Sequence, residues 1–124
     1  MPYKIYPSED SSYITLQVEG DFTAKDSMER NLEAHSIAKK LGINKFFVDV
    51  TNARNTDTII NNYQFAYEDM RKESGIDKNS IVAIVVSPED HSHDFVETVA
   101  MNSGLNVRFF RDKEKALEYI KSKT

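Results

Sequence analysis

The sequence contains no cysteine, and this absence removes several kinds of chemistry at once. Without thiols the chain can form no disulfide, no thiolate zinc site and no thiol nucleophile. A reducing, cytoplasmic location is therefore the expectation. The 124 residues predict a single domain spanning residues 1–124, because a chain of this length buries roughly two thirds of its unfolded surface without covalent cross-links.

Long apolar runs and an excess of positive charge are also missing. Residues 1–9 are too polar for a signal peptide, and no apolar stretch approaches the roughly 20 residues that cross a bilayer, so we expect no membrane insertion. The formal net charge is −4, whereas a protein that binds nucleic-acid phosphates needs a basic face. We therefore expect no nucleic-acid partner.

Glycine is scarce as well, and its positions follow the predicted elements. Gly20 follows a predicted strand, while Gly42, Gly75 and Gly104 each follow a predicted helix. None of them belongs to a glycine-rich phosphate-binding loop, and the sequence has no Ser/His/Asp ordering typical of a hydrolase. We expect no cofactor and no catalytic residue.

The spacing of apolar residues predicts the secondary structure. It has a period of two through residue 20, and beyond that point segments with a period of about 3.6 alternate with short apolar runs. Strands are predicted at residues 3–6 and 13–20, as a hairpin, and at 45–50, 81–86 and 106–110; helices are predicted to begin at residues 23, 57, 88 and 113. This order, ββαβαβαβα, predicts an α/β fold with a mixed, mostly parallel sheet covered by helices.

The first helix has clear end signals. Thr23 and Asp26 have the spacing of a capping box, and Gly42 is the expected stop. The apolar stripe that should face the core contains Met28, Leu32, His35, Ala38 and Leu41. The structural interpretation of His35 is a buried ring with a hydrogen-bond partner, and the alternative is a general base.

Three segments resemble the STAS fold of anti-sigma-factor antagonists, and more closely the stand-alone SpoIIAA-like proteins. They are residues 16–26, residues 46–50, and residues 107–112 with the 114–120 helix that follows. The resemblance implies a non-enzymatic regulatory module. It also implies a phosphorylatable serine where the helix after the third strand begins. No serine lies in the corresponding segment here, and the available hydroxyls are those of Thr51, Thr56 and Thr58.

The predicted loop after the third strand is the best candidate site. Its polar residues precede a helix N-terminus, where backbone N–H groups can bind an anion or a phosphorylated hydroxyl. The alternative is a loop whose side chains only cap the helix. The candidate ligand- or partner-binding residues are Thr51, Asn52, Arg54, Thr56, Asp57 and Thr58.

The second predicted helix carries two aromatic side chains that are candidates for a contact surface. Phe65 lies among polar residues, and Tyr67 is at the edge of the apolar stripe. Aromatic residues are enriched in interface cores, so this helix is predicted to contact a partner protein or a second copy of the chain as a homodimer. An isolated exposed aromatic residue with no role is the alternative.

Two other places invite a chemical interpretation. His91 and His93 would point roughly 160° apart on a helix, because successive residues turn by about 100°, so we predict no metal site. Asp49 lies inside an apolar strand and must find a partner or point out of the core.

The leading hypothesis is thus a non-enzymatic module that binds a partner protein or small ligand through the loop after strand three and the second helix. The alternative is a carrier of a small amphiphile, with a pocket under that helix. A small enzyme using Asp49, His35 or the histidine pair is the least favoured.

Overall fold

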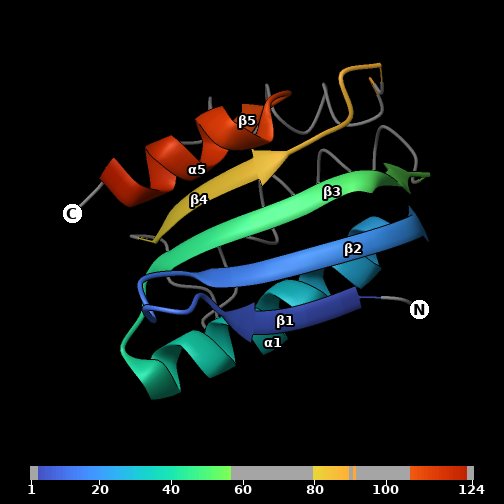
Figure 1. The fold of residues 1–124 in the computed structure, drawn as a ribbon. Coiled ribbons are helices and arrows are strands. Elements are labelled where there is room, and N and C mark those ends of the chain that lie inside the picture. Colours follow the sequence, from blue (N-terminus) through green and yellow to red (C-terminus); the bar gives the residue numbers. More distant parts are fainter. Residues whose placement is uncertain (1–2, 57–79, 90, 92–106, 123–124) are drawn as a thin grey trace.

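The computed structural model describes residues 3–56, 80–89, 91 and 107–122 (Figure 1). Within them the chain forms β1 (Tyr3–Pro7), β2 (Ile14–Phe22), α1 (Ala24–Leu41), β3 (Lys45–Asn55), β4 (Ile81–Val85), β5 (Val107–Phe110) and α5 (Lys113–Ser122). The helices predicted to begin at residues 57 and 88 lie outside these ranges. Neither described helix is both long and apolar enough to cross a bilayer.

The strands form one five-stranded sheet in the order β1-β2-β3-β4-β5. β1 and β2 pair antiparallel, with Tyr3 opposite Val18, which confirms the predicted hairpin. The β2–β3, β3–β4 and β4–β5 pairs are all parallel. The predicted α/β class with a mixed, mostly parallel sheet is therefore confirmed.

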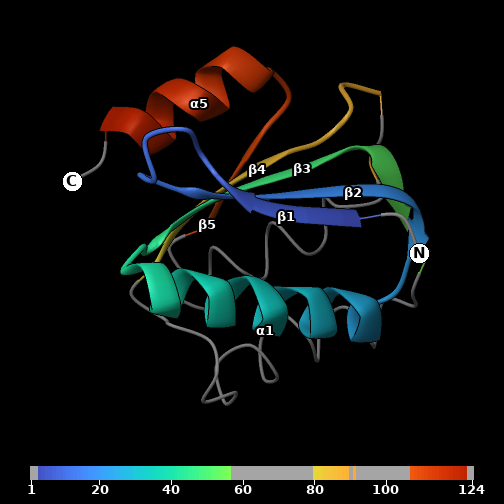
Figure 2. The same cartoon turned by 60° about the horizontal axis from the view of Figure 1, so that its bottom comes forward.

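The two described helices lie on opposite faces of the sheet (Figure 2). On one face, Ala34 and Ala38 of α1 pack against Ile14 and Phe46. On the other face, Ala116 and Ile120 of α5 join Phe47, Ala83 and Val85 in a second cluster. Successive side chains of β3 therefore pack in different layers, because the side chains of a strand point alternately to its two faces.

Both ends of α1 follow the sequence signals. The hydroxyl of Thr23 accepts a hydrogen bond from the Asp26 N–H, and the Asp26 carboxylate accepts one from the Thr23 N–H. Gly42 ends the helix in the left-handed conformation, with φ of 72°. The predicted stripe is only partly right, because Leu41 is exposed while Arg30, Ala34, His35 and Ala38 are buried.

The predicted end of the third strand was wrong. β3 continues past Val50 to Asn55, because its pairing with β2 resumes at Asn52 and runs to Asn55 opposite Phe22. The polar residues Asn52 and Arg54 alternate with the buried Ala53. The segment expected to be a loop is therefore mostly strand, held by a neighbouring strand.

The capping box predicts a local stability effect. Replacing Thr23 with Ala removes an acceptor for an otherwise unpaired N–H at the helix start, so Thr23→Ala should lower the free energy of unfolding by about 1 kcal/mol. Thr23→Ser keeps the hydroxyl, so its free energy of unfolding should stay close to that of the original protein. Urea denaturation measures both, and an equal loss in the two variants would contradict a hydrogen-bonding role.

Candidate functional site

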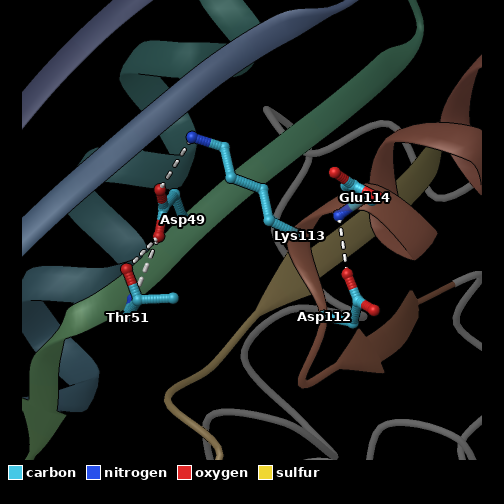
Figure 3. Close-up of polar contacts among 5 residues, drawn as sticks. All are labelled: Asp49, Thr51, Asp112, Lys113 and Glu114. Atoms are coloured by element: carbon cyan, nitrogen blue, oxygen red, sulfur yellow. Dashed lines mark hydrogen bonds and ion pairs between the residues drawn. The ribbon is translucent and has the colours of Figure 1, made fainter.

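Polar side chains gather where β3 passes the carboxyl end of β4 (Figure 3). Asp49 Oδ1 accepts two hydrogen bonds from Thr51, one from its backbone N–H at 3.0 Å and one from its hydroxyl at 2.7 Å. The Asp49 side chain is largely buried, and its other oxygen lies 3.9 Å from Lys113 Nζ. Asp49, which the sequence places inside an apolar strand, thus has both a hydrogen-bond partner, Thr51, and an ion-pair partner, Lys113.

An irregularity in strand pairing explains the Asp49–Thr51 contact. Asp49 is opposite Gln17 of β2, but the next registered pair is Glu19 with Asn52, and the β4 ladder ends with Asp49 opposite Val85. Val50 and Thr51 therefore have no registered partner on either neighbouring strand. Because an unpaired backbone N–H is costly in a partly buried strand, the Asp49 carboxylate supplies the missing acceptor for Thr51.

The start of α5 sets the position of Lys113. Asp112 Oδ1 accepts a hydrogen bond of 2.9 Å from the Glu114 N–H and so caps the helix. Lys113 extends from this first turn toward Asp49, and its side chain remains 63% exposed. An ion pair this exposed contributes little to stability, so Lys113 mainly places positive charge beside the β3 carboxylate.

The loop after β4 is tied to the end of β5. Arg111 Nη1 donates a hydrogen bond of 2.9 Å to the Ser87 carbonyl, and the Val86 N–H donates one of 2.9 Å to the Phe110 carbonyl. The carboxyl ends of the parallel strands are therefore held together by backbone contacts. This is the edge at which open α/β sheets commonly bind their ligands.

Beyond this edge, β2 and β3 continue as a two-stranded ribbon. On its α1 side, Val18, Phe22, Val50 and Ala53 are buried in one apolar cluster. The other side presents four exposed polar residues in register, Glu19 opposite Asn52 and Asp21 opposite Arg54. We call these four residues the ribbon surface.

Thr56 closes the end of the ribbon. Its N–H and its hydroxyl both donate to the Phe22 carbonyl, at 2.9 and 3.2 Å. The predicted site residues therefore fall into three groups. Asn52, Arg54 and Thr56 are exposed at the ribbon, Thr51 turns back to Asp49, and the remainder lie outside the described residues: Asp57, Thr58, Phe65 and Tyr67.

The histidines take different positions. His35 is buried, and its ring stacks on Phe46 with a centroid distance of 4.3 Å, as expected for a core histidine. His91 is exposed, whereas His93 lies outside the described residues. Across residues 3–56, 80–89, 91 and 107–122, no three His, Asp or Glu side chains come together as a metal site would require.

Comparison with known proteins now identifies the fold. An uncharacterised protein of the DUF3478 family with a SpoIIAA-like fold, from Shewanella loihica PV-4, matches with a TM-score of 0.54 and 18% identity, over 96% of this chain and 92% of that chain. The fold is SpoIIAA-like. No family model and no curated protein matches the chain.

Within this SpoIIAA-like fold, the ribbon surface contains residues that sequence reasoning missed. Glu19 and Asp21 are not among the predicted site residues, because the second strand was predicted to end at Gly20. The signal that could have found them is alternation, since buried Val18 and Phe22 flank two exposed acids. Lys113 was missed because only the fold brings it to Asp49.

The register shift at Val50 and Thr51 is a β-bulge, and it predicts how substitutions of Asp49 and of its ion-pair partner Lys113 affect stability. Asp49→Ala should lower the free energy of unfolding by about 1–3 kcal/mol, because the Thr51 N–H loses its acceptor. Asp49→Asn keeps an acceptor oxygen, so its free energy of unfolding should fall by less than that of Asp49→Ala. Lys113→Met should lose under about 1 kcal/mol, because its partner contact is largely solvated. Urea denaturation compares the three, and an Lys113→Met loss equal to that of Asp49→Ala would show that the ion pair, rather than the backbone contact, supports the strand.

Proposed function

We propose that this protein is a non-enzymatic binding module that contacts a partner protein through the ribbon surface. The observation that carries the proposal is the polar, exposed face of the β2–β3 extension opposite its buried apolar face. Strand pairing fixes the backbone of these residues before binding, so little conformational entropy is lost when a partner docks. Thr56 lies beside this surface, because its hydrogen bonds to Phe22 join the ends of the two strands.

The charge pattern of the ribbon surface favours a specific partner. Glu19 and Asp21 on β2 are negative, and Arg54 on β3 is positive, with Asn52 as a neutral donor and acceptor. Charges of both signs in a fixed array select a partner of complementary pattern and penalise others. A partner with a basic segment over β2 and an acidic group over Arg54 fits this arrangement.

The polar contacts below the ribbon support a structural rather than a catalytic role. Asp49 Oδ1 is occupied by two hydrogen bonds from Thr51, within a bulge that needs them. His35, the other residue considered for an enzyme, stacks on Phe46 beneath α1, whereas Asp49 faces Lys113 of α5. The two groups lie on opposite faces of the sheet, so they do not form one acid–base site.

The resemblance to anti-sigma-factor antagonists keeps phosphorylation among the predictions. A phosphate on Thr51 would stand against the Asp49 carboxylate, because the two side chains are 2.7 Å apart, and like charges at that distance repel. Thr56 is exposed beside the ribbon surface, so a phosphate there would change its charge directly. Thr58, the homodimer through Phe65 and Tyr67, and the amphiphile pocket all concern residues outside the described ranges and stay predictions.

Site-specific cross-linking in the native host tests the ribbon surface. With a photoreactive phenylalanine analogue at Asn52, we expect one discrete protein adduct, because the side chain points into the contact. The same analogue at Lys121, exposed on α5, should give no such adduct. Adducts of the same kind and amount from both positions would overturn the proposal, as would the absence of any adduct from Asn52.

A charge exchange separates recognition from folding. Asp21→Arg combined with Arg54→Asp keeps one charge of each sign in register but inverts the pattern, so the Asn52 adduct should fall at least about tenfold, as expected for a loss of more than about 1.4 kcal/mol. The matched control exchanges Lys115 and Glu118, both exposed on α5, and should leave the adduct unchanged. An adduct that survives the ribbon exchange would contradict charge recognition.

A further inference from the structure

Arg30 is a cation buried inside the layer between α1 and the sheet. It is 4% exposed, and it lies one and two helical turns before Ala34 and Ala38, which pack on Ile14 and Phe46. Its Nη2 atom is buried and has no hydrogen-bond partner. Among the described residues, it is the one buried side-chain nitrogen or oxygen left in this state.

A buried guanidinium nitrogen that has no acceptor is unfavourable in a folded chain. Arginine does not lose its proton in proteins, so it cannot become neutral as a buried lysine can. A buried donor of a charged group that lacks an acceptor keeps the cost of its lost hydration. The described structure offers Arg30 an aromatic ring instead, since Tyr3 lies with its ring centroid 5.1 Å from the guanidinium carbon. A ring compensates a cation only in part.

Tyr3 covers the guanidinium from the outer edge of the sheet. It belongs to β1, the outermost strand beside β2, and its residue is 38% exposed while Arg30 beneath it is nearly inaccessible. Its hydroxyl donates a long hydrogen bond of 3.3 Å to Glu33 on α1, and that carboxylate raises the pKa of Tyr3. Figure 2 shows β1 at the edge of the sheet above α1.

The surroundings define which anion would fit. Glu33 and Glu29 act on Tyr3 from the same side, so a dianion approaching Arg30 would meet two negative charges. Ile5, the next residue of β1 on this face, packs against the apolar clusters. A carboxylate matches the planar guanidinium with two parallel hydrogen bonds and carries a single charge. An apolar chain attached to it would lie beside Ile5.

We propose that Arg30 is the anchor of a binding site for an organic monocarboxylate, covered by the ring of Tyr3. The carboxylate accepts hydrogen bonds from the guanidinium, and Tyr3 turns aside to admit it. This site is on the α1 face of the sheet at its β1 edge, whereas the ribbon surface is on the opposite face. The inference therefore goes beyond the proposed function and does not rest on it.

Octanoate is a suitable probe, below its micellar concentration, with binding followed by calorimetry and by the Arg30 side-chain NMR signals. We expect octanoate to bind the original protein and to shift those signals. Arg30→Met should weaken binding by about ten- to a hundredfold, the effect of losing a charge-assisted hydrogen-bond pair. Arg30→Lys keeps the positive charge but cannot form two parallel hydrogen bonds, so its affinity for octanoate should lie between those of the original protein and Arg30→Met. Octanol and inorganic phosphate should bind more weakly than octanoate.

The stability of Arg30→Met is an independent readout. Replacing a buried guanidinium that has an unsatisfied nitrogen with an apolar side chain of similar length should leave the urea midpoint unchanged or raise it. A strongly destabilised Arg30→Met would mean that the folded chain already pairs Arg30, and the proposal would fall. It would also fall if octanoate bound both proteins equally or bound neither, and phosphate binding as tight as octanoate would overturn the monocarboxylate assignment. The cross-links from the ribbon surface do not depend on Arg30, so either proposal can fail alone.

Discussion

The alternation of β3 between two layers is the constraint on which this structure depends. Phe46 and Val48 face α1, while Phe47 and Asp49 face α5, so this strand closes both cores at once. A strand buried on both sides cannot slip by one residue, because every apolar side chain would exchange layers. β3 therefore fixes where β2 and β4 pair, and through them where the two described helices lie.

The bulge at Val50 and Thr51 is where this constraint is relaxed. If β3 had no bulge, its side chains would alternate strictly from Asp49 onward. Ala53 would then face the α5 side with Asp49, while Asn52 and Arg54 would face the α1 side. The shift by one residue instead returns Ala53 to the apolar cluster with Phe22 and directs Asn52 and Arg54 outward. The Asp49 carboxylate makes that shift acceptable by accepting the Thr51 N–H. The Asp49–Thr51 contact thus stabilises the point at which the polar residues of β3 change faces.

The sequence predicted the elements that depend on local signals. The hairpin, the Thr23 capping box and the Gly42 stop are all encoded within a few residues, and all three are present. The extension of β3 was missed because the bulge interrupts the period of two just where the polar residues begin. From Thr51 onward the pattern resembles a loop, and only pairing with β2 makes it a strand.

Arg30 was missed for a different reason. The core-facing side of the first helix was predicted from its apolar residues, such as Met28 and Leu32. A charged residue does not contribute to that pattern, so nothing in the sequence indicated that Arg30 is buried. The structure buries Arg30 with Ala34 and Ala38 instead.

Asp49 and Arg30 are both buried charges, yet they differ in the partners that the fold gives them. Asp49 is satisfied by Thr51, a neighbour in sequence, so its charge is explained by folding alone. Arg30 Nη2 has no acceptor among the described residues, and the Tyr3 ring compensates the guanidinium only in part. A buried donor that the fold leaves without an acceptor is where a ligand becomes a good explanation.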